Sequence, residues 1–229
     1  MEKFISMVSH ELKSPLAAIR LLADTLLQQE SVSGEMYREF LNDIIHEADR
    51  GVSIIDDLHM MAELEEKGNR TKNLSMVNAD VTSIIERQIR NFQRDAEQNN
   101  ITVKFYSYQR KLITDEGILS FVIKNLLENA IKYNRPGGWV EITLYQDEKD
   151  FCLKVEDSGV GIDESEREKI FIPFYRIKEK NNDSVPGTGL GLAIVDEAVR
   201  CLNGRIEVSG EKGKGSSFLV RLPAESQIK

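Results

Sequence analysis

A histidine near the start of the chain stands beside a carboxylate and one helical turn before a hydroxyl. These residues are His10, Glu11 and Ser14, and Pro15 follows directly. Helical periodicity places His10 about 160° from the apolar stripe of its segment, so we expect its imidazole to face water. Such an imidazole is a nucleophile, and a neighbouring carboxylate can orient it and take its proton. A lone exposed histidine is usually an ordinary surface residue, but a mid-helix proline costs about 3 kcal/mol, which favours a functional interpretation.

A second group of polar residues lies in the segment NLLENAIKYN. Asn125, Asn129 and Lys132 are spaced four and three residues apart, so they share one face of a helix whose other face is apolar. Amide oxygens can bind a hard cation such as Mg²⁺, and a lysine can neutralise phosphate. The alternative is an amphipathic helix with a polar outer face, and this segment alone does not decide between them.

Two glycine-rich segments follow. VEDSGVGI ends a predicted strand at Asp157, whose carboxylate can accept a hydrogen bond from an exocyclic amine, while Gly159 and Gly161 let the backbone approach a planar ring. GTGLGLAIV runs into a predicted helix, and the first amides of a helix attract phosphate. GTGLGLAIV is not the dinucleotide fingerprint, because its spacing differs and no strand directly precedes it, and GKGSS is not a P-loop, because Gly215 follows Lys214 where Ser or Thr is required. Together with the asparagine helix, these segments predict a nucleotide site of another kind.

The first of the elements that must position these residues is a helical hairpin. Apolar residues recur every three or four positions from Ile5 to Leu26 and from Tyr37 to Ala62, on either side of the polar break QQESVSGE. This period predicts two helices of about 28 and 32 residues, the second capped by Ser33. Both segments carry further apolar residues off the main stripe, so we expect two hairpins to pair in a dimeric four-helix bundle.

Beyond the polar stretch EEKGNRTKN, short strand-like runs alternate with helical segments near residues 79–98, 116–133, 163–170 and 190–203. The alternating polarity of the strands predicts a sheet with one wet face and one face covered by helices. We therefore predict an α+β protein with a helical hairpin at 1–67, a linker at 68–73 and an α/β sandwich at 74–225. The aperiodic stretch RIKEKNNDSVPGTG predicts a lid or a disordered loop.

Charge and composition exclude several classes of protein. Residues 1–67 contain 14 acidic and 6 basic side chains, which accounts for the whole net charge of −8. No basic stripe with interleaved aromatic residues is present, so we expect no nucleic-acid partner. Cys152 and Cys201 lie in apolar patterns and are expected to be buried reduced thiols rather than a disulfide.

The chain also lacks the sequence signals of membrane insertion. No apolar run approaches the roughly 18 residues of a membrane span, and the N-terminus lacks the apolar core of a signal peptide. We expect a soluble, cytoplasmic portion that meets a membrane only through segments absent from this chain. Only nine residues precede His10, so the first helix is expected to begin upstream.

These motifs, in this order, resemble the catalytic core of a bacterial sensor histidine kinase. FISMVSHELKSPL resembles the phospho-acceptor box, NLLENAIKYNRPGG the N box, IFIPFYRI the F box, and VEDSGVGI and GTGLGLAIV the two glycine boxes, with GKGSSF as the closing glycine segment. The resemblance covers nearly the whole chain. It implies a dimerisation and histidine phosphotransfer hairpin followed by an ATP-binding sandwich related to those of gyrase, the ninety-kilodalton heat-shock chaperones and mismatch-repair ATPases.

The resemblance also implies a role for each matched residue. His10 would be the phosphorylated nucleophile and Glu11 its acid/base partner. Asn129 would hold Mg²⁺, with Asn125 supporting the phosphate region, and Asp157 would accept a hydrogen bond from the adenine amino group. The other implied ATP contacts are Lys132, Tyr133, Gly159, Gly161, Arg176, Gly187, Thr188, Gly189, Leu190 and Gly191.

The implied activity is ATP-dependent autophosphorylation of His10, followed by phosphoryl transfer to an aspartate of a response regulator receiver domain. Related ATPases carry a water-activating glutamate at the position of Asn125, and its absence favours transfer to a protein side chain over hydrolysis. Ser14 stands where Thr or Asn is usual in members that also dephosphorylate their partner, so a phosphatase activity is left open. Ile172 replaces an acidic residue common in the F box.

Two alternatives from other classes stay open. One is a dimeric scaffold that binds nucleotide only as a switch, and the other is a serine/threonine kinase of the anti-sigma type from the same ATPase superfamily. The handedness of the turn around residues 28–35 would decide between phosphorylation within and between protomers, and the sequence does not predict it.

Overall fold

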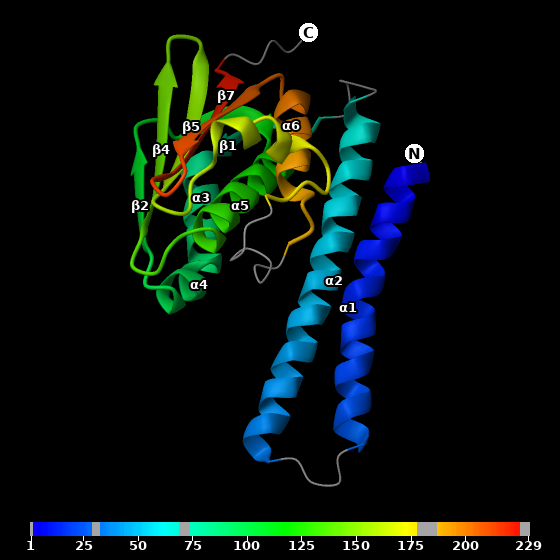
Figure 1. The fold of residues 1–229 in the computed structure, drawn as a ribbon. Coiled ribbons are helices and arrows are strands. Elements are labelled where there is room, and N and C mark those ends of the chain that lie inside the picture. The colour runs from blue at the N-terminus through cyan, green and yellow to red at the C-terminus, as the bar shows by residue number, and fades with distance from the viewer. Residues whose placement is uncertain (1, 29–32, 69–73, 178–186, 225–229) are drawn as a thin grey trace. The chain divides into compact units, whose positions relative to one another are not determined.

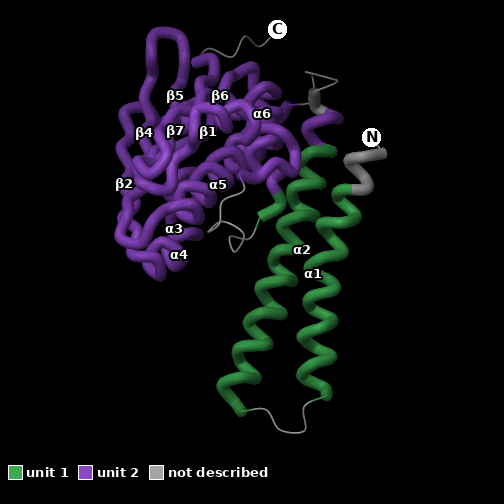
Figure 2. The backbone as a smooth tube through the Cα atoms, viewed as in Figure 1, with its two compact units in different colours: residues 1–62, 186–188 green, residues 63–185, 189–229 purple. Residues whose placement is uncertain are grey.

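The computed structural model describes residues 2–28, 33–68, 74–177 and 187–224. Residues 69–73 of the predicted linker and 178–186 of the predicted lid lie outside the described residues, as does the side chain of Ile5. The chain divides into two compact units, one of residues 1–62 with 186–188 and one of residues 63–185 with 189–229 (Figure 2). Each unit is described by itself.

The first unit contains most of the predicted helical hairpin, and the end of its second helix, from Glu63 onward, belongs to the second unit. Helices α1 (Glu2–Gln28) and α2 (Gly34–Gly68) run side by side in opposite directions (Figure 1). They contain 27 and 35 residues, close to the predicted lengths. The amide of Met36 donates to Oγ of Ser33 at 3.3 Å, which confirms Ser33 as the cap of α2. Pro15 lies inside α1 and is buried.

The second unit contains a five-stranded sheet with the strand order β2-β4-β5-β7-β6. Its strands β2 and β4 are parallel, and the other neighbours pair antiparallel. A separate antiparallel pair joins β1 to β3. The strands are β1 (Met76–Asp80), β2 (Thr102–Ser107), β3 (Lys111–Asp115), β4 (Trp139–Asp147), β5 (Asp150–Asp157), β6 (Arg205–Glu211) and β7 (Gly215–Pro223).

Helices cover one face of this sheet, as the alternating polarity predicted. Val140, Ile142 and Leu144 of β4 are buried, whereas the residues between them are partly exposed. Figure 1 shows the helices of this unit gathered on one face of the sheet. They are α3 (Val81–Asn91), α4 (Gln93–Gln98), α5 (Glu116–Lys132) and α6 (Gly191–Cys201).

Two of the predicted helices differ from the structure. The helix predicted at 79–98 begins at Val81, because Asp80 caps it by accepting from the amide of Ser83, and it is broken at Phe92. The helix predicted at 163–170 is instead two 3₁₀ turns, η2 (Glu164–Glu166) and η3 (Lys169–Phe171). Its prediction was wrong because Asp163 accepts from the amide of Ser165, which starts a tight turn, and the polar segment buries only Ile170.

Two further expectations concern the thiols and membrane spans. Cys152 is buried and Cys201 is half-buried, and both are free thiols, which confirms the prediction against a disulfide. Across the described ranges, no helix combines the length and the apolar character that crossing a membrane requires.

Candidate functional site

Asp157 ends strand β5 as a buried carboxylate, only 8% exposed. Its Oδ1 accepts hydrogen bonds from the amide of Gly159 at 2.7 Å and from the amide of Ser216 at 3.3 Å. Burial raises the pKa of the Asp157 carboxyl to about 6, and these hydrogen bonds, which favour the charged form, oppose this only in part. The structure therefore presents one buried acceptor at the end of a strand, as the adenine role requires.

Several positions around the Asp157 carboxylate are glycines, because a larger residue there would clash with the neighbouring backbone. A Cβ on Gly159 would clash with the carbonyl oxygen of Tyr133, and a Cβ on Gly215 with the backbone of Asp157. Gly161 adopts a φ of +71°, in the left-handed region that favours glycine. The first glycine segment and the closing glycine segment thus pack directly on each other, which brings strand β7 to the site.

Helix α5 carries the predicted phosphate and metal face. Asn125 is buried and donates to the carbonyl of Phe121 at 3.1 Å, and its Oδ1 lies where a Cβ on Gly191 would be. This contact joins Asn125 to the start of α6, the helix end predicted to attract phosphate. The structure therefore brings the N box and the second glycine box together.

Asn129 lies one turn further along α5 and is half-buried. No other described residue engages its side-chain amide, and the described residues contain no group of three His, Cys, Asp or Glu side chains that could hold a metal ion. A single amide oxygen fits Mg²⁺ that receives its other ligands from water and phosphate oxygens, which is the usual state of that ion beside a nucleotide.

The last turn of α5 supplies a cation and an aromatic ring. Lys132 places its Nζ 5.5 Å from the centre of the Tyr133 ring. Burial raises the pKa of Tyr133, while the positive charge of Arg176 opposes the shift. Arg176 therefore acts electrostatically on the same end of α5, although 43 residues separate it from Tyr133 in sequence.

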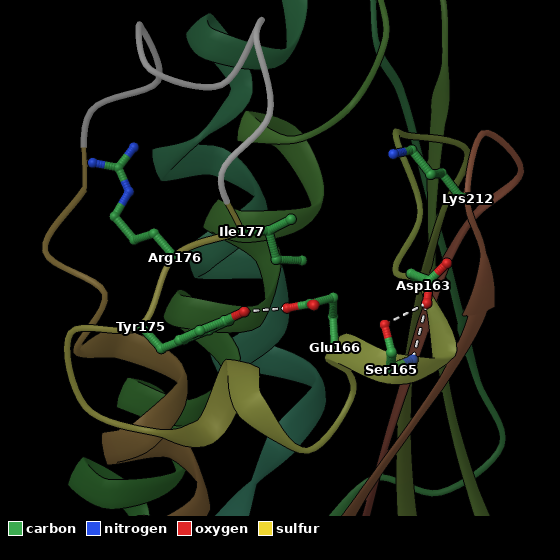
Figure 3. Close-up of a pocket in the computed structure, with 7 residues that line it drawn as sticks. All are labelled: Asp163, Ser165, Glu166, Tyr175, Arg176, Ile177 and Lys212. Carbon is green, nitrogen blue, oxygen red and sulfur yellow. Dashed lines mark hydrogen bonds between the residues drawn. The ribbon is translucent and has the colours of Figure 1, made fainter.

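Arg176 also lines a cavity of about 450 Å³, together with Asp163, Ser165, Glu166, Tyr175, Ile177 and Lys212. Figure 3 shows Arg176 on one side of this space and Lys212 and Asp163 on the other, with Glu166 between them. Asp157 and Asn129 do not line it. The cavity therefore lies at the Arg176 edge of the predicted nucleotide site rather than at its adenine end.

A hydrogen bond holds the segment that carries Arg176. The hydroxyl of Tyr175 donates to Glu166, and Lys169 donates to the same carboxylate at 3.0 Å. The bond raises the pKa of Tyr175 and lowers the pKa of Glu166. Phe174, which precedes Tyr175, has a φ of +64°, and its amide donates a hydrogen bond to the carbonyl oxygen of Gly189 at 2.9 Å. The F box is thus fixed from both sides.

Gly189, Leu190 and Gly191 belong to the second unit, where Leu190 is fully buried. Gly187 and Thr188 are grouped with the first unit, in which Oγ1 of Thr188 donates to Oδ2 of Asp57 at 3.0 Å. The unit boundary therefore falls inside the second glycine box, between Thr188 and Gly189.

His10 lies on α1 with its side chain 84% exposed, as the helical periodicity predicted. Its Nδ1 is 3.8 Å from Oε1 of Glu11, which is within ion-pair range but too long for a hydrogen bond. Ser14 is exposed one turn further along. The face of α1 that carries His10 thus combines an accessible imidazole, a carboxylate beside its Nδ1 and a hydroxyl.

Sequence reasoning missed Ser216 and the pair Glu166–Tyr175. GKGSSF was identified only as a closing glycine segment, but a serine next to its last glycine was a signal that its amide could reach the site. The sequence did not indicate the hydrogen bond between Glu166 and Tyr175, because it forms only when the two 3₁₀ turns bring these residues together.

Comparison with known proteins agrees with this arrangement. Residues 114–226 match the family described as histidine kinase-, DNA gyrase B- and HSP90-like ATPases, and residues 1–67 match the His Kinase A (phospho-acceptor) domain. The fold and the site define an ATPase domain preceded by a phospho-acceptor hairpin. The chain belongs to the sensor histidine kinase family, of which it contains the catalytic core.

Among its relatives is the sensor-like histidine kinase SenX3 of Mycolicibacterium smegmatis, 31% identical over 96% of this chain and 56% of that protein. The chain thus spans about half the length of this curated relative. The solved structure of the mycobacterial sensor histidine kinase MprB is 30% identical, with a TM-score of 0.57 over 66% of this chain and 99% of that one. The histidine kinase AdeS of Acinetobacter baumannii has the same fold, with a TM-score of 0.73 and 22% identity over 95% of this chain and 98% of that one.

Proposed function

We propose that this chain is an ATP-dependent protein-histidine kinase that phosphorylates His10 and passes the phosphoryl group to an aspartate of a response regulator. The observation that carries the proposal is the accessible imidazole of His10 with its Nδ1 directed toward Glu11. This orientation leaves Nε2 as the nitrogen open to an incoming phosphoryl group. The buried carboxylate of Asp157, with glycines packed around it, supports ATP as the donor.

The chemistry follows from these positions. The lone pair of Nε2 on His10 attacks the γ-phosphorus in line, the bond from that phosphorus to the bridging oxygen breaks, and ADP leaves with the electron pair. The proton on Nδ1 passes to Glu11, which neutralises the phosphorylated imidazole. Lys132 and Arg176 balance the negative charge of the phosphates. Mg²⁺ bound at Asn129 would supply further charge neutralisation.

Proteins of the same fold support the donor and the acceptor. ShkA, 24% identical with a TM-score of 0.69, was solved with AMPPNP. ThkA, 19% identical with a TM-score of 0.69, was solved with the response regulator protein TrrA. A homodimeric hairpin, a receiver-domain partner and a membrane reached only through further segments are part of the same proposal.

The test is incubation with γ-labelled ATP and Mg²⁺, followed by acid and base treatment. A phosphohistidine is lost in acid and kept in base, whereas phosphoserine and phosphothreonine survive acid, so the result separates this function from a serine/threonine kinase. A nucleotide-switched scaffold would take up no label. His10→Gln should abolish labelling and leave ATP affinity within about twofold, because His10 contributes little to ground-state binding.

His46 provides a matched control. It is also exposed and is followed directly by a glutamate, but it has no hydroxyl or proline partner at the same spacing. His46→Gln should keep the full acid-labile label. Label that persists in the His10 variant would show that the acceptor is another residue.

A further inference from the structure

Arg50 of α2 reaches across the hairpin to the carboxylate beside the phospho-acceptor histidine. Its Nη2 lies 3.6 Å from Oε2 of Glu11 on α1, and its Nη1 lies 3.8 Å from Oε2 of Glu47 on its own helix. Arg50 is one of only 6 basic residues in the acidic segment 1–67. The hairpin therefore places one of its few positive charges next to the Glu11 carboxylate.

The two oxygens of Glu11 face different groups. Oε1 lies 3.8 Å from Nδ1 of His10, and Oε2 faces the guanidinium of Arg50. Adjacent residues on a helix point about 100° apart, so a glutamate that follows a histidine does not contact it by default. Its carboxylate must be turned along the helix surface, and a partner on the second helix is what can hold it in that orientation.

The environment makes this ion pair stronger than a surface pair. The side chains of Arg50 and Glu11 are 23% and 29% exposed. By contrast, Arg20 and Asp24 on α1 form a pair at 3.7 Å with side chains 85% and 54% exposed. Solvent screens the exposed pair, whereas partial burial preserves more of the attraction at Arg50. The guanidinium charge is delocalised, so it attracts the carboxylates of Glu11 and Glu47 at the same time, at 3.6 and 3.8 Å.

Arg50 is held in its place by burial as well as by charge. Its Nε is buried and no described residue accepts a hydrogen bond from it, and Oε2 of Glu47 is likewise buried without a hydrogen-bond partner. Burying these polar atoms without hydrogen bonds is unfavourable. The ion pairs of Arg50 with Glu11 and Glu47 offset this cost, so electrostatic attraction rather than hydrogen bonding holds the guanidinium beside Glu11.

We propose that Arg50 is a positioning residue for histidine phosphorylation: it holds the Glu11 carboxylate so that Oε1 faces Nδ1 of His10 and Nε2 stays directed outward. The inference rests on the proposed kinase function. Arg50 touches neither nucleotide nor the reacting nitrogen, so it acts only through Glu11. Its loss should therefore slow the phosphoryl transfer step and leave ATP binding unchanged.

The experiment measures autophosphorylation rates of the full chain at several ATP concentrations for the parent and for Arg50→Met, which keeps an unbranched side chain and removes the charge. We expect kcat to fall about tenfold to a hundredfold, the range that misalignment of a reacting group produces. KM for ATP should stay within about twofold. Arg50→Lys restores the charge and should recover part of the rate.

A double-variant cycle shows whether the effect passes through Glu11. In a Glu11→Gln background, Arg50→Met should cause little further loss, because the group that it orients is already gone. Arg20→Met is the matched control, since it removes an arginine ion pair from the same hairpin away from Glu11, and it should leave kcat unchanged. Circular dichroism and light scattering confirm that each variant keeps its helices and its assembly.

The outcomes separate the inference from the function on which it rests. A parent chain that takes up no acid-labile label would defeat the kinase function itself. A labelled parent with an Arg50→Met variant of equal kcat would overturn the positioning role alone. A loss of rate that is fully additive with Glu11→Gln, or one matched by a loss of helicity, would also overturn it and make Arg50 a structural residue.

Discussion

The amide of Ser216 donates a hydrogen bond to Oδ1 of Asp157, across 59 residues of sequence. The bond forms because β7 pairs antiparallel with β5, which sets Ser217 opposite Glu156 and brings the start of one strand to the end of the other. A side chain on Gly215 would push the strands apart at this point. The carboxylate predicted to accept from adenine is therefore positioned by the pairing of two strands and not only by the loop that follows it.

The raised pKa of Asp157 predicts a specific dependence of stability on pH. Its carboxyl binds a proton more tightly in the folded domain, with a pKa of about 6, than in the unfolded chain, where the ordinary value is 3.8. The protonated carboxyl therefore contributes to the stability of the folded domain. The contribution is complete below about pH 4 and is lost as the pH rises through about 6. At pH 8 the nucleotide-free domain should therefore carry a penalty of about 3 kcal/mol.

Asp157→Asn should remove that penalty, because the amide cannot ionise and its oxygen can still accept from Gly159 and Ser216. Without nucleotide, we expect the variant to melt several degrees higher than the parent at pH 8, with a difference that shrinks toward pH 5. Thermal unfolding across this range is the measurement. The same variant should bind ATP and ADP more weakly, and equal melting temperatures at every pH would contradict the assigned burial penalty.

The sequence predicted most of the helices and strands because buried apolar residues recur with the period of the element that contains them. The strand containing Val140, Ile142 and Leu144 and the stripes of α1 and α2 were predicted in this way. The segment 163–170 failed because the side chain of Asp163 competes with a helical start, and such competition leaves no period. Asn129 and Asp157 were predicted from motifs. The contacts of Ser216 with Asp157 and of Arg50 with Glu11 could not be predicted, because only the strand register and the folded hairpin bring these residues together.

Asn129 carries the predicted contact with the metal. Replacing it with alanine removes the only side-chain oxygen assigned to Mg²⁺, so Asn129→Ala should lose the part of ATP affinity that depends on Mg²⁺. Titration calorimetry with Mg²⁺ and with a chelator separates the two components. The variant and the parent should match in chelator, and a variant that also matches the parent in Mg²⁺ would rule out this role.

Ser14 lies one turn from His10 on the same exposed face, where its hydroxyl could position water for removal of a phosphoryl group from the regulator. Ser14→Ala should therefore leave autophosphorylation largely intact and reduce dephosphorylation of a phosphorylated receiver domain. The assay follows loss of label from the receiver with the parent and with the variant. Equal rates of loss would exclude the hydroxyl from that step.

Dimerisation is expected because the hairpin leaves large apolar side chains uncovered. Ile55 of α2 is 56% exposed, and the others include Leu16, Leu21, Ile45 and Val52. At about 25 cal/mol per Å² such a surface is costly to leave in water, and a second hairpin in a four-helix bundle would cover it. The net charge of −8 on residues 1–67 opposes association, but salt screens exposed charges, so burial should prevail.

The test introduces charges on the apolar face of α2 and compares the result with a charge added at a polar position of the same helix. Ile44→Asp combined with Ile55→Asp should give monomers by light scattering at tens of micromolar protein, whereas Asn42→Asp, which adds a charge at an exposed polar position, should stay dimeric. Residues 63–229 alone should be monomeric and still bind ATP. That fragment keeps Leu64, which is fully buried and whose carbonyl accepts from the thiol of Cys201 in the second unit. A parent chain that is monomeric under the same conditions would defeat the four-helix bundle and confine phosphorylation to a single chain.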